Sequence, residues 1–370
     1  MIKVLQMPVR NAKGGITQYA LRNWEHIDKS RFIFDWVTLD KELSFEKELE
    51  QQGCKVHHLS CRQEDDEQRF RDEMKSILSG GYDVLHLHTS YWRGFLAEEL
   101  ALEAGIAKII VHAHSTGVDI SDDIERKKLL AIHNEWKSRF NNKLATHFAA
   151  CSMSAAGFLF GPQIPEDSIK ILNNAIDTDK FAFDIKKRAE IRRKLNIEDK
   201  LVIIQPARLE HQKNPQFTLR VFSNIVKQVP EAVLLYVGDG SLRSQLKNEA
   251  NESGLSDNVR FLGFQNNISN LLQASDLFVM PSHFEGLGIS AIEAQCSGLF
   301  CLLSEKIPRE AVITGKTKCL KLNEKLWVDE INMLAQKGYK RENCSGEVIS
   351  AGFSLKKQVG KLEELYTGEE

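Results

Sequence analysis

The run Leu201-Val202-Ile203-Ile204-Gln205, followed by a polar loop and then by a helix-like segment from about Pro215, decides the fold. A short apolar run bounded by turn residues indicates a buried strand. A strand that leads through a loop into an amphipathic helix is half of a βαβ unit. The same alternation continues in both directions along nearly the whole chain, so the sequence predicts an α/β fold with parallel sheets covered by helices.

We expect two such sheets, each in a Rossmann-like, doubly wound domain, with a cleft between the domains. The first domain is expected over residues 1–180, the second over 181–350, and a C-terminal helix in 351–370 is expected to pack back on the first domain. Predicted strands of the first sheet lie at 3–7, 34–38, 55–59, 84–88, 109–112, 147–150 and 169–172, and those of the second, smaller sheet at 201–205, 233–236, 260–262, 277–280 and 300–303. Ligands of such folds bind beyond the carboxyl ends of the strands, so we expect the active site in the cleft.

The composition is that of an ordinary globular protein. The chain of 370 residues is 42% hydrophobic and 27% charged, which excludes a disordered or coiled-coil chain. Its 49 basic and 51 acidic side chains nearly cancel, so no overall positive field would gather nucleic acid. Apolar stretches are shorter than the roughly 18 to 20 residues of a membrane span. We therefore expect a cytoplasmic protein that binds no nucleic acid and keeps its 7 cysteines reduced.

Gly14 and Gly15 follow the first predicted strand and open the next helix. Backbone N–H groups at such a turn can hold a phosphate or a sugar, and a simple tight turn explains the pair equally well. Another glycine pair, Gly238 and Gly240, comes deep in the chain and has Arg243 where a dinucleotide-binding motif has its third glycine. A nicotinamide-dependent dehydrogenase is therefore disfavoured.

Arg208 and Lys213 lie in the loop between the strand at 201–205 and the helix from about Pro215. A guanidinium and an ammonium group at a strand's carboxyl end, beside a helix amino terminus, suit the two phosphates of a nucleoside diphosphate. The alternative is a solvated basic loop, because most surface Arg and Lys residues bind nothing.

Two glutamates, Glu285 and Glu293, flank the glycine-containing segment Gly286-Leu287-Gly288. Glycines expose backbone N–H groups, and carboxylates accept hydrogen bonds from vicinal hydroxyls, so this segment could hold a nucleotide sugar. Alternatively, Glu285 caps the following helix and Glu293 is a surface acid. Helix capping explains a glutamate at the amino terminus but not one deep in an apolar helix.

Four histidines, His86, His88, His112 and His114, lie at the ends of two successive predicted strands. We expect at most one histidine of each pair to face the cleft, because side chains alternate between the faces of a strand. Cysteine or carboxylate ligands are missing at suitable spacing, so the sequence predicts no metal site. His114 is the histidine that we expect to contact a sugar, and the other three are expected to be structural.

The segment 124–144 is predicted to be a basic amphipathic helix. Its apolar residues recur at spacings of three and four: Leu129, Ile132, Trp136, Phe140 and Leu144. Such a helix could lie on an anionic membrane or accept a lipid-linked pyrophosphate. Packing against its own domain is the more common explanation, and we favour it.

Taken together, these motifs resemble the retaining glycosyltransferases of family 4, which have the GT-B fold, and in particular the capsular and exopolysaccharide branch of that family. The resemblance covers most of the chain. It rests on the Gly14-Gly15 loop, Val111-His112-Ala113-His114-Ser115, Ala150-Cys151-Ser152 with Phe158-Leu159-Phe160-Gly161, Asn173-Asn174-Ala175-Ile176-Asp177, Arg208 with Lys213, Phe261-Leu262-Gly263, and Glu285 with Glu293.

The resemblance implies a donor-binding set of Gly14, Gly15, Arg208, Lys213, Glu285, Gly286, Leu287, Gly288 and Glu293. Within this set, Arg208 and Lys213 would bind the diphosphate and Glu293 the ribose. Glu285 and the glycine amides would bind the donor sugar and phosphate. His114 would contact the sugar from the other domain. His114, Arg208, Lys213 and Glu285 are thus the expected catalytic residues.

The implied reaction moves a sugar from a nucleoside-diphosphate sugar to a hydroxyl of a saccharide, or lipid-linked saccharide, with retention of anomeric configuration, in cell-surface polysaccharide biosynthesis. It requires no metal and no cofactor, and the leaving phosphate itself could deprotonate the acceptor. Peripheral contact with the inner membrane face is compatible with this function. Two alternatives stay open: a sugar-nucleotide epimerase of the same fold, and a non-catalytic partner subunit that binds a nucleotide sugar.

Overall fold

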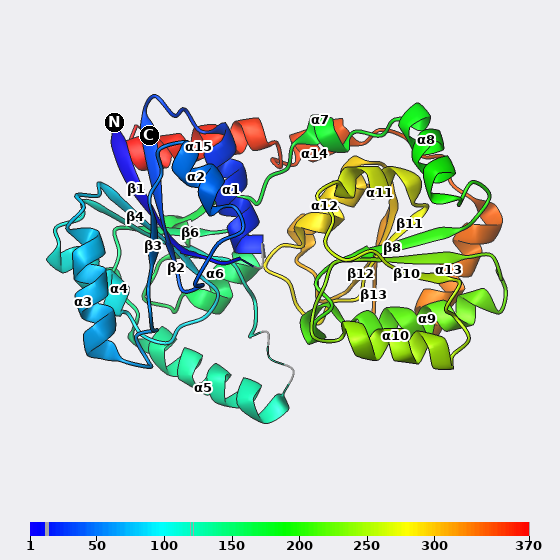
Figure 1. The fold of residues 1–370 in the computed structure, drawn as a ribbon, viewed down its shortest axis with the longest axis horizontal. Coiled ribbons are helices and arrows are strands. Elements are labelled where there is room, and N and C mark those ends of the chain that lie inside the picture. Colours follow the sequence, from blue (N-terminus) through cyan, green and yellow to red (C-terminus); the bar gives the residue numbers. More distant parts are fainter. Residues whose placement is uncertain (12–14, 119, 121, 370) are drawn as a thin grey trace. The chain divides into compact units, whose positions relative to one another are not determined.

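The computed structural model describes residues 1–11, 15–118, 120 and 122–369. These residues form two compact units (Figure 1). The first unit comprises the described residues of Met1–Val118, Asp123–Ala175 and Leu355–Glu370. The second comprises those of Ile176–Ser354 together with the short stretch Asp119–Asp122. The last helix of the chain therefore belongs to the first unit.

The first unit is built on a parallel sheet of 7 strands in the order β3-β2-β1-β4-β5-β6-β7. The strands are β1 (Ile2–Val9), β2 (Phe32–Thr38), β3 (Val56–His58), β4 (Val84–Thr89), β5 (Lys108–Ala113), β6 (His147–Ala150) and β7 (Ile169–Ile171). The strand order reverses direction between β1 and β4, which is the switch point where doubly wound sheets bind ligands.

The sheet of the first unit is covered by helices, which shield the apolar strands from water. These are α1 (Gly15–His26), α2 (Glu46–Gln51), α3 (Glu67–Leu78), α4 (Leu96–Glu103), α5 (Asp123–Arg139), α6 (Met153–Leu159) and α15 (Leu355–Thr367). One core cluster joins Trp24 of α1 and Trp36 of β2 to Leu362 and Tyr366 of α15. The Lys108 ammonium group also donates a 2.6 Å hydrogen bond to the carbonyl oxygen of Leu365. Burial of its apolar face thus holds α15 on the first sheet.

The second unit is built on a parallel sheet of 6 strands in the order β10-β9-β8-β11-β12-β13. The strands are β8 (Val202–Pro206), β9 (Val233–Val237), β10 (Val259–Phe261), β11 (Leu277–Met280), β12 (Phe300–Ser304) and β13 (Thr317–Leu320). β8, β9 and β11 are buried along their whole length, as expected of parallel strands covered on both faces. The predicted α/β fold with two Rossmann-like parallel sheets, the second one smaller, is confirmed.

Helices lie on both faces of the second sheet, with α9 and α10 below it and α11 and α12 above it in Figure 1. The helices are α7 (Thr178–Phe181), α8 (Ile185–Leu195), α9 (Pro215–Val226), α10 (Arg243–Glu252), α11 (Ile268–Ala274), α12 (Ile289–Cys296), α13 (Glu324–Lys337) and α14 (Ser345–Ser350). The sequence did not predict β13. It is an edge strand whose middle residues, Lys318 and Cys319, are exposed, so it lacks the apolar run that marks the other strands.

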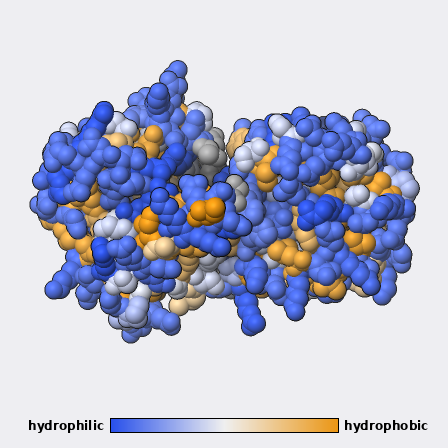
Figure 2. Space-filling model, turned by 90° about the horizontal axis from the view of Figure 1, so that it is seen from below, coloured by the Kyte–Doolittle hydropathy of each residue, from blue (hydrophilic) through white to orange (hydrophobic). Residues whose placement is uncertain are grey.

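Helix α5 packs against its own unit through one edge. His133 is its buried residue, and the backbone N–H of Trp92 donates a 3.1 Å hydrogen bond to His133 Nδ1. The Trp136 ring meets the Phe95 ring edge to face at 5.1 Å. The opposite side is solvated, and Ile124 is 81% exposed. Figure 2 shows a mostly hydrophilic face there, with small apolar patches. In the described part of the chain, no helix combines the length and the apolarity that a membrane crossing requires.

Candidate active site

The loop between β8 and α9 carries Arg208 and Lys213. Its end is fixed to the strand because the Gln205 side chain donates a 2.8 Å hydrogen bond to the backbone oxygen of Lys213. Asn214 then takes the left-handed conformation, with φ of 50°, before α9 begins at Pro215. Asparagine adopts this conformation more readily than most residues. The loop therefore turns sharply and leaves Lys213 at the carboxyl end of the sheet.

The two glycines after β9 let their loop lie directly against the β8 loop. A Cβ atom on Gly238, whose φ is +144°, would stand 2.1 Å from the backbone oxygen of Ala207. A Cβ on Gly240 would stand 2.4 Å from that of Leu209. Both distances are shorter than any van der Waals contact, so these positions require glycine. The glycine pair thus shapes the loop that carries Arg208.

Lys213 and Glu285 form an ion pair between the β8 loop and the β11 loop. The Lys213 Nζ atom lies 2.6 Å and 2.7 Å from the two carboxylate oxygens of Glu285. The side chains are 17% and 7% exposed. Ser282 donates a further 2.7 Å hydrogen bond to Glu285 Oε1. A buried pair with several hydrogen bonds is a strong electrostatic unit, and it joins two of the predicted site residues.

Gln212 connects Arg208 to the same cluster. The Arg208 guanidinium donates a 3.1 Å hydrogen bond to the Gln212 side-chain oxygen, and the Gln212 amide donates a 3.0 Å hydrogen bond to the backbone oxygen of Phe284. The backbone N–H of His283 donates a 2.9 Å hydrogen bond to the backbone oxygen of Gln212. The sequence analysis missed Gln212 and Ser282, since neutral polar residues carry no distinctive pattern.

The segment after Glu285 leads into α12 without regular structure. Gly288 precedes the helix with φ of +92°, a conformation that favours glycine. Leu287 is only 2% exposed and anchors the segment. Glu293 lies in α12 and is only 5% exposed, which excludes its alternative interpretation as a surface acid. Burial of a carboxylate requires hydrogen-bonding or charged partners.

The glycine pair of the first unit is described only in part. Gly14 lies outside the described residues. Gly15 is the first residue of α1, and a Cβ added there would meet no atom within 4 Å among the residues that the structure describes. Packing against the described residues therefore does not explain a glycine at position 15.

The prediction that at most one histidine of each pair faces the cleft was wrong in its geometry. Residues two apart on a strand point to the same face, and the rings of His86, His88, His112 and His114 gather on one face of the first sheet. The rings of His86 and His88 stack with centroids 4.4 Å apart, and those of His112 and His114 lie 4.0 Å apart. Tyr19 of α1 contacts all four rings.

Burial keeps the histidine cluster neutral. It lowers the pKa of His88 to about 3, and it lowers the pKa values of His86, His112 and His114 well below the ordinary value. The cause is loss of hydration of the charged form, to which the neighbouring imidazoles add repulsion. Neutral imidazoles hydrogen-bond through one donor and one acceptor nitrogen each.

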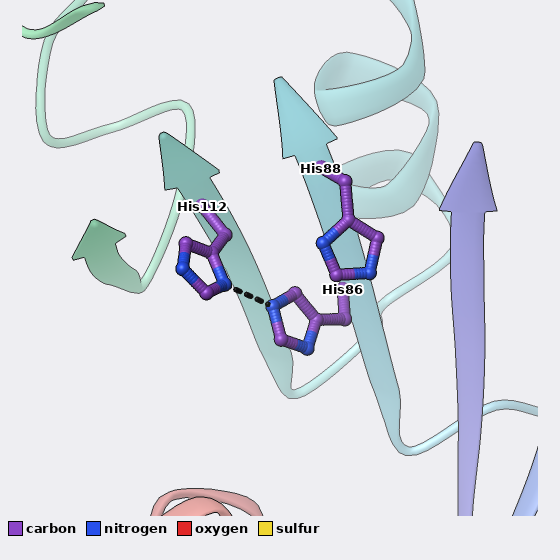
Figure 3. A group of neighbouring side chains, drawn as sticks. All are labelled: His86, His88 and His112. Atoms are coloured by element: carbon purple, nitrogen blue, oxygen red, sulfur yellow. Dashed lines mark hydrogen bonds between the residues drawn. The ribbon is translucent and has the colours of Figure 1, made fainter. Parts of the chain in front are cut away.

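Three of the histidines could in principle hold a metal ion. One nitrogen each from His86, His88 and His112 lies within 4.8 Å of the others (Figure 3). However, His86 Nε2 and His112 Nδ1 already share a 3.1 Å hydrogen bond. A divalent ion would also bring two positive charges into a buried site whose ligands are all neutral, which is costly. The residues present fit a hydrogen-bonded cluster better than a metal centre.

Known proteins similar to this chain are glycosyltransferases. Residues 187–348 match the family model of glycosyl transferases group 1. The "Putative glycosyltransferase EpsF" of Bacillus subtilis (strain 168) is 28% identical over 363 residues, which cover 96% of this chain and 93% of that protein. An Escherichia coli UDP-Gal:alpha-D-GlcNAc-diphosphoundecaprenol alpha-1,3-galactosyltransferase is 28% identical over 316 residues, which cover 80% of this chain and 79% of that enzyme.

Among solved structures, Anabaena Alr3699/HepE in complex with UDP aligns over 100% of both chains with a TM-score of 0.76 at 16% identity. This similarity concerns the fold, and it extends over both units. The matched segment 187–348 contains Arg208, Lys213, Glu285 and Glu293. The chain thus has the GT-B architecture of two Rossmann-like domains, and its segment 187–348 matches the family model of glycosyl transferases group 1.

Proposed function

We propose that this protein is a retaining glycosyltransferase that moves a sugar from a nucleoside-diphosphate sugar to a hydroxyl of a saccharide acceptor, without a metal ion. The observation that carries the proposal is the joining of Arg208, Lys213 and Glu285 into one hydrogen-bonded cluster at the carboxyl ends of β8 and β11. These residues come from two loops that are far apart in the sequence. A cluster of charges at this edge of a doubly wound sheet is suited to a phosphorylated ligand.

Stabilisation of the leaving diphosphate is the chemical role of Arg208 and Lys213. Negative charge develops on the diphosphate as its bond to the sugar breaks, and cations fixed in advance stabilise that charge without reorganisation. In the free protein the Lys213 ammonium group is held by Glu285. Glu285 thereby positions Lys213 and keeps a polar group ready for a hydroxyl of the sugar.

The β11 loop and α12 would hold the rest of the donor. The backbone N–H groups of Gly286 to Gly288 are proposed to bind the donor, and the amino terminus of α12 favours negative charge. Glu293, buried one turn into that helix, is proposed to accept hydrogen bonds from the ribose hydroxyls. From the first unit, His114 would contact the transferred sugar, and Gly15 would lie beside the donor.

The acceptor proposed here is a saccharide on a lipid diphosphate, in the biosynthesis of a cell-surface polysaccharide. Support comes from the name of the Escherichia coli relative, which acts on a diphosphoundecaprenol-linked sugar. A chain acting on such an acceptor would work at the cytoplasmic face of the membrane. The solvated side of α5, with Ile124 exposed, is the proposed place of peripheral contact.

Acceptor-dependent turnover tests the function. The protein is incubated with a panel of UDP-sugars, with and without lipid-diphosphate saccharides, and released UDP and anomeric configuration of the product are measured. UDP release only in the presence of acceptor, with an α-linked product from an α-linked donor, is expected. Conversion of the donor without acceptor would instead indicate an epimerase, and tight binding without any turnover would indicate a partner subunit.

Substitutions in the cluster test the residue assignments. Lys213→Ala or Glu293→Ala should lower kcat/KM on the order of 100-fold, because each removes a charge-assisted contact with the donor. The matched control is Lys318→Ala, in which a lysine of the same unit loses its contact with Glu330 at the edge strand β13. Turnover of the control should stay within about twofold of the unmodified protein. Equal activity of all three variants would refute the assignments.

A further inference from the structure

A continuous hydrogen-bonded network runs through the middle of the first unit and ends at His114. It connects residues of four elements that are far apart in sequence: Gln6 on β1, His86 and His88 on β4, His112 and His114 at the end of β5, and Tyr366 on α15. All but His114 are at most 3% exposed. Because burial keeps the four imidazoles neutral, each has one N–H donor and one bare nitrogen acceptor. The proton positions therefore depend on one another.

The Gln6 side chain fixes the first of these proton positions. Its oxygen lies 2.8 Å from His88 Nε2, and an amide oxygen can only accept. His88 Nε2 therefore carries the proton, and its Nδ1 is bare. His88 Nδ1 lies 3.0 Å from His114 Nε2, so His114 Nε2 must donate. In a neutral imidazole this leaves His114 Nδ1 without a proton.

The Gln6 side-chain nitrogen fixes the proton positions in the second branch of the network, which runs through Tyr366 to His86 and His112. It donates a 2.9 Å hydrogen bond to the hydroxyl of Tyr366, and that hydroxyl lies 2.7 Å from His86 Nδ1. The Tyr366 O–H group is thus free to donate to His86, whose Nε2 then donates over 3.1 Å to His112 Nδ1 (Figure 3). Every one of the four histidines is therefore the Nε2–H tautomer.

The network ends at two buried nitrogens. His114 Nδ1 and His112 Nε2 have no hydrogen-bond partner among the residues that the structure describes. By the proton positions above, the former is a bare acceptor and the latter an N–H donor. A buried polar atom without a partner costs stability, so an acceptor kept in this state is suited to a ligand that brings a donor.

We propose that Gln6 and His88 are positioning residues that hold His114 in the Nε2–H tautomer, so that its bare Nδ1 accepts a hydrogen bond from a hydroxyl of the transferred sugar. This inference rests on the proposed function, and it specifies the chemistry of one contact: the sugar must present a hydrogen-bond donor to His114. The opposite orientation of the Gln6 amide would reverse every bond of the network. It would place a proton on His114 Nδ1 and select an acceptor group on the sugar instead.

The tautomers are measured directly by long-range ¹H–¹⁵N correlation NMR of the full chain labelled with ¹⁵N-histidine, without substrate. The four cluster histidines should show protonated Nε2 and bare Nδ1. A protonated Nδ1 on His114, or exchange between its two tautomers, would overturn the inference. Because no substrate is present, this result is independent of whether the protein is a glycosyltransferase, and an inactive protein with the expected spectrum would refute only the proposed function.

Two variants separate positioning from packing. Gln6→Leu removes the acceptor of His88, so His114 should lose its single tautomer, and kcat/KM should fall about 10-fold, the equivalent of one hydrogen bond. Tyr366→Phe removes a buried hydroxyl from the other branch and should leave His114 as the Nε2–H tautomer. An unchanged His114 spectrum in Gln6→Leu would refute the role of Gln6. If that variant does not fold, the spectrum of the unmodified protein decides alone.

Discussion

The pair between Lys213 and Glu285 should show strong energetic coupling in a double-mutant cycle. Lys213→Met keeps the apolar stem and removes the ammonium group that both oxygens of the buried Glu285 carboxylate contact. Breaking a buried ion pair costs roughly 3 to 5 kcal/mol. The Lys213 side chain keeps 17% of its surface exposed, and Ser282 still donates to Glu285, so we expect the lower end, about 3 kcal/mol.

Adding Glu285→Gln to Lys213→Met also removes the buried carboxylate charge. The double variant should therefore be no less stable than Lys213→Met alone. The sum of the two single costs should exceed the cost of the double variant by about 2 kcal/mol, the range expected of residues in direct contact. These free energies are measured by urea unfolding, which is monitored through hydrogen exchange in peptides of the second unit.

The control for the cycle is the pair between Lys194 and Glu190 in α8. It has the same residue types in the same unit, but both side chains are exposed, at 69% and 53%. Solvent screens such a pair, and Lys194→Met should cost less than about 1 kcal/mol. A coupling energy below about 0.5 kcal/mol for Lys213 and Glu285 would show that the pair is not the electrostatic unit inferred from its geometry.

Three further results are expected, each measured by urea unfolding. Gly238→Ala should destabilise the second unit by more than about 2 kcal/mol, because its Cβ would overlap the Ala207 oxygen, whereas Gly360→Ala, in open space within α15, should be neutral or slightly stabilising. Burial raises the pKa of Glu98 to about 8. The protonated carboxyl therefore stabilises the fold at low pH, and this contribution is lost as the pH rises. Between about pH 5 and pH 7.5, the free energy of unfolding of the unmodified protein should fall by about 1.4 kcal/mol per pH unit relative to that of Glu98→Gln. In the Glu98→Gln background, the buried histidines His86, His88 and His112 should dominate the pH dependence of stability. Because their pKa values are lowered in the folded state, stability should be lost as the pH falls below about 6.5, by up to about 4 kcal/mol per pH unit for the three together. A flat profile would contradict their burial as neutral groups.

The histidine cluster illustrates what a sequence pattern can and cannot predict. The spacing of two within each histidine pair was enough to place both rings on one face, and the prediction failed because that periodicity was applied wrongly. No pattern, in contrast, points to Gln6 or Tyr366 as partners of the cluster. They are 360 residues apart in the chain, and only the packing of α15 on the first sheet brings them together.

The fold class was determined by the sequence alone, because alternating apolar strands and amphipathic helices bury their surfaces in only a few ways. The edge strand β13 escaped prediction, since an exposed strand has no need of an apolar run. For the site, the sequence indicated which charged residues are candidates, as charge and glycine placement are local properties. The contact between Lys213 and Glu285, the bridging role of Gln212 and the tautomers of the histidines depend on distances between separate loops and strands. Tertiary structure alone decides these, because hydrogen bonds and ion pairs act over a few ångströms in space, whatever the separation along the chain.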